Sequence, residues 1–67
     1  MKIEILVDGH VAATQIVSEA LYPVKPTVRE AKLIALKAAL EDRSIKLPDS
    51  LRATFRAFDV TGNPIDE

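Results

Sequence analysis

The sequence predicts a small α+β domain in which a strand, a second strand, a helix and a third strand follow one another. Three observations lead to this prediction: an alternating segment that ends in Asp-Gly, a long helical segment without glycine or proline, and a second alternating segment after it. The third strand should run antiparallel to the first and lie beside it. We therefore expect one domain over residues 1–67, with strand order 2-1-3 and the helix on one sheet face.

The first 17 residues are expected to form a β-hairpin. Apolar residues alternate with polar or mixed positions over residues 2–7, and Asp8-Gly9 favours a two-residue type I′ turn. This turn would place Ile5 opposite Ala12 and Ile3 opposite Thr14. The expected helix-covered face consists of Ile3, Ile5, Val7, His10, Ala12, Thr14 and Ile16.

The opposite face of this hairpin is more apolar in its middle than a solvated face requires. Antiparallel sheets commonly leave one face in contact with water. Because Leu6, Val11 and Val17 fall on this face, it is a second, weaker candidate for a partner surface.

The segment after Pro26 has the clearest helical pattern. Thr27 and Glu30 match a capping box, in which each side chain bonds the backbone N–H of the other residue. Residues 28–43 are rich in Ala, Leu, Lys, Glu and Arg, which are good helix formers. Pro48 disfavours helix just before it, so we expect the helix to end near Ser44 to Lys46.

The helix carries two apolar stripes, whereas packing on one sheet needs only one. One stripe contains Leu33, Leu36 and Leu40. The other contains Ala31, Ile34, Ala35, Ala38 and Ile45. Either stripe can face the sheet: the leucines bury more area, and the alanines permit close approach of a neighbouring helix. We expect the remaining stripe to contact a partner or, in the case of the alanines, to be half exposed to water.

A third strand is expected from Leu51 to about Val60. The expected inward residues are Leu51, Ala53, Phe55 and Ala57, and the expected outward residues are Arg52, Thr54 and Arg56. Phe58 and Val60 fall on the face of the arginines, so a bulge near Ala57 is predicted, and Phe58 is interpreted as a core residue. Thr61 to Pro64 form a turn signal, after which Ile65 could pair in a short C-terminal hairpin.

Composition narrows the classes of function. The chain has no cysteine, one histidine and a net charge of −1, so we expect no disulfide, no metal site and no other cofactor. We expect neither a leader peptide nor a membrane span, and we expect the chain to be soluble and cytoplasmic. A chain of this size has a small core and is often stabilised by oligomerisation.

No residue pattern points to catalysis. His10 is the one histidine and the first candidate for a general base, but the sequence offers no nucleophile for it. The nearest carboxylate in sequence is Asp8, at a turn position where aspartate is common. Glycine-rich phosphate loops and calcium-loop spacings are missing. We therefore expect no catalytic residue and infer no small-molecule substrate.

The sequence is most consistent with a non-catalytic protein-interaction module, either a homodimer or a subunit of an assembly. The candidate interface residues are Leu33, Leu36, Leu40, Ala31, Ala35 and Ala38. The alternative is an accessory protein that binds nucleic acid through a local basic patch. The candidate contacts for this alternative are Arg52, Arg56, Lys25 and Arg29.

Overall fold

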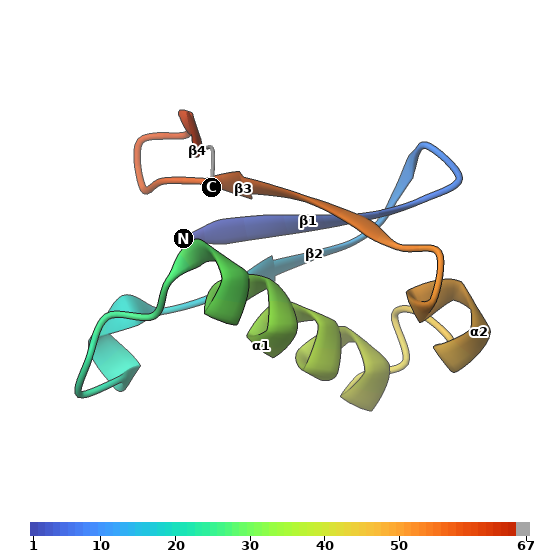
Figure 1. The fold of residues 1–67 in the computed structure, drawn as a ribbon, viewed down its shortest axis with the longest axis horizontal. Helices are drawn as coiled ribbons and strands as arrows, with labels where there is room; N and C mark the ends of the chain where they lie inside the picture. The colour runs from blue at the N-terminus through green and yellow to red at the C-terminus, as the bar shows by residue number, and fades with distance from the viewer. Residues whose placement is uncertain (66–67) are drawn as a thin grey trace.

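A computed structural model describes residues 1–65 of the chain, and its elements follow the predicted order with two short helices added (Figure 1). In chain order the elements are β1 (Lys2–Val7), β2 (His10–Ile16), the 3-10 helix η1 (Glu19–Leu21), α1 (Val28–Glu41), α2 (Leu47–Ser50), β3 (Thr54–Phe58) and β4 (Pro64–Ile65).

The strands form one antiparallel sheet with the order β2-β1-β3-β4. α1 packs on one face of this sheet, closest to β2 and β1 (Figure 1). This arrangement confirms the predicted α+β fold and the order 2-1-3. β4 pairs with the end of β3 and supplies the short C-terminal hairpin.

The β1–β2 turn has the predicted type. Asp8 and Gly9 have φ angles of 52° and 80°, and a type I′ turn requires positive φ at both positions. Val7 lies opposite His10, as the two-residue turn predicts.

Beyond the turn the predicted register is wrong, because β2 contains a bulge. Ala12 is an extra residue without a partner on β1, so every later residue of β2 is shifted by one position. The observed pairs are Ile5 with Ala13 and Ile3 with Gln15, instead of Ile5 with Ala12 and Ile3 with Thr14.

From Ala13 onward the residues of β2 lie on the face opposite to the predicted one, since a shift of one residue turns each side chain to the other side of the sheet. Ile16, which was expected under the helix, is 70% exposed on the open face. Val17 is buried in its place. Its N–H donates to the Met1 carbonyl at 2.8 Å, and the Met1 amino group donates to the Val17 carbonyl at 3.0 Å.

α1 begins at the predicted capping box. The Glu30 N–H donates to the Thr27 hydroxyl at 3.1 Å, and the Thr27 N–H donates to the Glu30 carboxylate at 3.0 Å. Two of the N–H groups that a helix start leaves without backbone partners are thereby satisfied.

α1 ends at Glu41, about three residues earlier than predicted. Arg43 has a φ of 63°, and its N–H donates to the Leu40 carbonyl at 3.3 Å. The Ser44 N–H donates to the Ala39 carbonyl at 2.9 Å. These two bonds form a Schellman motif, which terminates the helix at a left-handed residue well before Pro48.

The alanine and isoleucine stripe of α1 faces the sheet. Ala31, Ala35 and Ala39 have no exposed surface, and the largest fully buried side chains of the described residues are Ile3 and Ile5 on β1. The small methyl groups let the helix backbone lie close to these isoleucines. Ala39 was assigned to neither stripe from the sequence, although it follows Ala35 by one turn.

β3 is shorter than the predicted strand from Leu51 to Val60. Residues 47–50 form α2 instead, with Pro48 in its first turn and the Ser50 hydroxyl donating to the Leu47 carbonyl at 2.6 Å. Proline is common in the first turn of a helix, because the N–H groups of that turn have no acceptor within the helix and the absence of one costs nothing. Leu51 therefore lies outside the strand and is 85% exposed instead of facing inward.

The bulge predicted near Ala57 is also wrong. β1 and β3 pair in regular register, with Ile3 opposite Ala57 and Lys2 opposite Phe58. Plain alternation therefore places Phe58 on the open face, and its interpretation as a core residue is wrong. The Lys2 ammonium lies 4.8 Å from the centroid of the Phe58 ring, within the range of a cation–π interaction.

Candidate interaction surfaces

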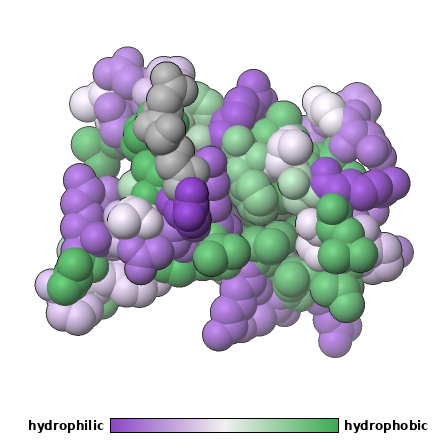
Figure 2. Space-filling model, in the orientation of Figure 1, coloured by the Kyte–Doolittle hydropathy of each residue, from purple (hydrophilic) through white to green (hydrophobic). Residues whose placement is uncertain are grey.

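Five leucines of α1, α2 and the residue after α2 form the main apolar surface, which we call the leucine surface. Its members are Leu33, Leu36, Leu40, Leu47 and Leu51. Leu33 and Leu47 are 63% and 66% exposed, while Leu36 and Leu40 are half-buried against the core. Figure 2 shows hydrophobic residues gathered across the middle and right of the molecule, over α1, α2 and β3.

The half-buried part of the leucine surface, Leu36 and Leu40, lies on the side of α1 that faces β3 and β4. Lys32 lines a cavity of about 360 Å³ together with Phe55, Ala57 and Ile65. Leu36 follows Lys32 by one helical turn, so it lies on the same side of α1. Only residues 42–46 separate α1 from α2, which keeps Leu47 near the end of this side.

The structure separates the six predicted interface residues into three groups. Leu33, Leu36 and Leu40 belong to the leucine surface. Ala31 and Ala35 are fully buried against the sheet, so no partner can contact them in the folded chain. Ala38 is half-buried on the opposite flank of α1, where it lines a cavity of about 280 Å³.

Leu47 and Leu51 were not predicted as interface residues. Leu51 was placed inside the sheet because residues 51–57 alternate in hydrophobicity. The signal that could have identified both residues is Pro48 followed by Asp49 and Ser50, since proline and acidic residues favour the first turn of a helix.

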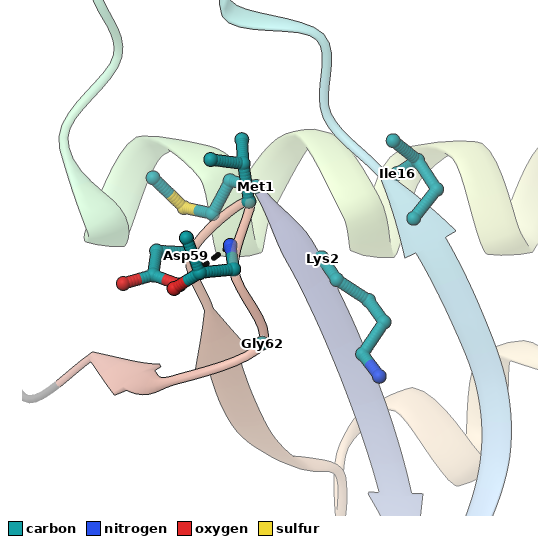
Figure 3. A pocket seen from close by; sticks show the side chains of 7 residues that line it. Met1, Lys2, Ile16, Asp59 and Gly62 are labelled. Atoms are coloured by element: carbon teal, nitrogen blue, oxygen red, sulfur yellow. Dashed lines mark hydrogen bonds between the residues drawn. The ribbon is translucent and has the colours of Figure 1, made fainter.

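The open face of the sheet is more polar in its centre than the leucine surface. Glu4 on β1 and Arg56 on β3 form an ion pair of 3.1 Å there. An open depression of about 440 Å³ lies at one end of the sheet, between Met1 and Ile16 and the β3–β4 turn (Figure 3). This face stays the weaker candidate.

Among the predicted nucleic-acid contacts, Lys25, Arg52 and Arg56 take part in ion pairs. Lys25 lies 3.6 Å from Glu19, and Arg56 pairs with Glu4. Arg52 lies 2.7 Å from Asp49, and the Asp8 carboxylate is 3.5 Å away.

The four cations belong to separate parts of the fold. Lys25 precedes α1, Arg29 lies in the first turn of α1, Arg52 lies between α2 and β3, and Arg56 lies on the open sheet face. The fold does not gather them on one element.

The carboxyl groups with shifted pKa values act in turns and caps. Hydrogen bonds from the Ser44 hydroxyl, the Ser44 N–H and the Gln15 amide lower the pKa of Asp42. The Thr61 hydroxyl and the Asn63 N–H lower the pKa of Asp59, and the Thr27 N–H and hydroxyl lower that of Glu30. These bonds hold the local backbone and leave the carboxyl groups exposed.

Among the described residues, no catalytic or metal-binding site is found at the remaining polar side chains. His10 is exposed at the start of β2, opposite Val7. Residues 1–65 contain no cluster of three or more His, Cys, Asp or Glu residues that could hold a metal ion. Every helix in this range is too short or too polar to cross a membrane.

The chain was compared with models of known protein families, with curated protein sequences and with solved structures. None of these comparisons gave a significant match, so they assign the chain to no family.

Proposed function

We propose that the chain is a small, non-catalytic protein-interaction module that self-associates through the leucine surface, as a homodimer or as a subunit of a larger assembly. The observation that carries this proposal is the exposure of Leu33 on α1 and of Leu47 and Leu51 at α2, each more than 60% exposed. Large exposed apolar patches often mark an interaction site.

The small core of the monomer supports the same proposal. The helix buries mainly alanines against the sheet, and Ile3 and Ile5 are the largest fully buried side chains of the described residues. The accessible surface is 4741 Å², whereas a folded monomer of this length would expose about 4200 Å². If the leucine surface packed against a second copy, part of this excess accessible surface would be buried.

The spacing of the leucines fits a short helix-to-helix contact. Leu33, Leu36 and Leu40 have the i, i+3 and i+7 spacing of a knobs-into-holes seam. A two-fold axis would bring the same surface of both copies together, with Leu47 and Leu51 extending the contact from α2.

The test is the molar mass in solution, measured by light scattering over a dilution series. The parent chain should form at least a dimer, and Leu33→Glu should lower its mass while the circular dichroism spectrum stays unchanged. Leu21→Glu is the matched control, because Leu21 is 80% exposed but lies on η1, away from the leucine surface. A parent that stays monomeric at every concentration would contradict the proposal.

The alternative of a nucleic-acid-binding accessory protein gains no specific support, since Lys25, Arg52 and Arg56 are engaged in ion pairs on separate elements. The cytoplasmic location expected from the sequence stays a prediction.

A further inference from the structure

The two edges of the sheet differ in how they are protected against pairing with another strand. β4 has only two residues, and one of them is Pro64. β2 has seven residues, with no proline and no Lys, Arg, Asp or Glu. Short length, proline, charged side chains or bulges normally prevent an edge strand from pairing with a strand of another molecule. The bulge at Ala12 is the single such device in β2, and it leaves residues 13–16 regular.

The hydrogen-bond pattern identifies which backbone groups of β2 point to the free edge. Met1 and Val17 exchange both backbone hydrogen bonds, so they form a hydrogen-bonded pair. Such pairs alternate with non-hydrogen-bonded pairs along an antiparallel ladder. Gln15 therefore bonds toward β1, while Thr14 and Ile16 direct their N–H and C=O groups away from the sheet.

The flank of α1 beside this edge is partly apolar and carries both signs of charge. Tyr22, Ile34 and Ala38 line the cavity of about 280 Å³ there. Lys37 and Glu41 line the same cavity and lie 3.9 Å apart. This flank is opposite the side of Lys32, which faces β3 and β4, so it lies above the β2 side of the sheet.

We propose that β2 pairs antiparallel with β2 of a second copy of this chain, around a two-fold axis at Gln15. Thr14 of each copy would then exchange two backbone hydrogen bonds with Ile16 of the other, which gives four bonds in total. The two sheets become one continuous sheet, and both α1 helices lie on the same face of it.

Charge and symmetry favour a second copy as the occupant of this edge. β2 contains no Lys, Arg, Asp or Glu, so the two strands meet without like charges opposite each other. The nearest acidic group is Asp42, which accepts from the Gln15 amide at 2.9 Å and would lie near Asp42 of the second copy. In an antiparallel pair of helices, Lys37 of one copy can meet Glu41 of the other. Ile34 and Ala38 of both copies would then be buried between the two helices. This apolar burial would stabilise the contact in addition to the backbone hydrogen bonds.

This contact is separate from the leucine surface, which lies on the other side of α1. Each copy would therefore have two different two-fold contacts. Two such contacts on different faces build assemblies larger than a dimer, either closed or open-ended.

The first test adds charge to the free edge. Thr14→Lys would place two lysines diagonally across the proposed axis, on the same face and about 7–8 Å apart, and should lower the mass of the assembly measured by light scattering. Thr54→Lys is the matched control, because Thr54 is an exposed threonine on the same open face but lies on β3, which takes no part in the proposed contact. Thr14→Pro removes the outward N–H and should have the same effect as Thr14→Lys, with the circular dichroism spectrum retained.

The second test measures the register directly. The chain has no native cysteine, so Gln15→Cys introduces a single thiol. At the proposed axis the two Cα atoms would lie about 4.5 Å apart, which is within the range that a disulfide can bridge. Mild oxidation should give a covalent dimer on a non-reducing gel. His10→Cys, on the same strand but five residues away, should give much less.

The outcomes separate this inference from the proposed function. If Leu33→Glu and Thr14→Lys each reduce a larger parent assembly to a dimer, and the double variant is monomeric, both contacts exist. If Thr14→Lys alone abolishes association, the edge contact stands and the leucine contact fails. If Leu33→Glu alone abolishes association, or if Gln15→Cys and His10→Cys cross-link equally, the edge contact is overturned. A monomeric parent overturns both.

Discussion

The two faces of the sheet show similar alternation of residues but have opposite environments. On the covered face, Ile3 and Ile5 are fully buried under the alanines of α1. On the open face, the Glu4–Arg56 ion pair lies at the centre, and exposed Ile16 lies at the edge. The Arg56 side chain is 57% exposed and that of Glu4 18% exposed, so water screens the pair in part and it contributes on the order of 1 kcal/mol or less. Stability therefore depends mainly on the covered face, which leaves the open face and the β2 edge available for contacts.

Ile5→Ala is expected to give the largest effect and tests this comparison directly. Removing a fully buried isoleucine leaves a cavity under α1, so the free energy of unfolding should fall by about 2–5 kcal/mol. Val11→Ala is the control on the open face, because Val11 is 47% exposed and lies outside the proposed contact at residues 14–16, and it should change this free energy by less than about 0.5 kcal/mol. Urea unfolding at one fixed protein concentration measures both, and equal losses would contradict the comparison.

Ala35→Leu tests whether the small residues of α1 are required for packing on the covered face. Ala35 has no exposed surface, so a larger side chain must displace the helix or the isoleucines beneath it. The free energy of unfolding should fall by about 1–3 kcal/mol. Ala38→Leu makes the same change at a half-buried flank position and should cost less than half as much. A stabilised Ala35→Leu variant would show that the helix has room to move.

Arg43→Gly tests the turn that places α1 on the covered face. Arg43 has a φ of 63°, a conformation that glycine adopts without strain. The substitution should raise the free energy of unfolding by about 0.5–1 kcal/mol, which thermal and urea unfolding can detect. Arg43→Ala keeps the strain and should give no increase. A similar gain from both substitutions would mean that the arginine side chain, not the backbone, is unfavourable.

The sequence predicted the elements of the fold where local signals are strong. Asp8-Gly9 identified the turn, and Thr27 with Glu30 identified the start of α1. The end of α1 was missed because a Schellman motif usually has glycine, and here Arg43 takes the left-handed position. The bulge at Ala12 was missed because the residues of β2 allow either register, and packing of Val17 beneath the helix selects one.

The candidate surface was only partly predictable for the same reason. Helical spacing identified Leu33, Leu36 and Leu40, but it left open which stripe packs on the sheet, because both stripes are apolar. The outward N–H and C=O groups of Thr14 and Ile16 depend on the register that the bulge sets. No local pattern in the sequence contains that information.

Acid unfolding tests a smaller effect than the substitutions above. It compares how much the hydrogen bonds of one carboxyl group on the covered side and of one in the β3–β4 turn contribute to stability. On the covered side, the Gln15 amide donates to the Asp42 carboxylate at 2.9 Å and so links β2 to the end of α1. Asp59 makes comparable bonds within the β3–β4 turn alone, to Thr61 and Asn63. Both carboxyl groups have pKa values below the ordinary value of 3.8 in the folded chain.

Since these pKa values are lowered by folding, the unfolded chain takes up protons first as the pH falls. The stabilisation is complete above about pH 4 and is lost as the pH falls through the lowered folded pKa values. Urea midpoints measured from pH 5 to pH 2 should therefore fall less for Asp42→Asn and Asp59→Asn than for the parent. Gln15→Ala should reduce the fall only slightly, since the Ser44 bonds to Asp42 remain. If Gln15→Ala reduces it as much as Asp42→Asn, the link between β2 and α1 dominates the pKa of Asp42, and the local bonds from Ser44 are secondary.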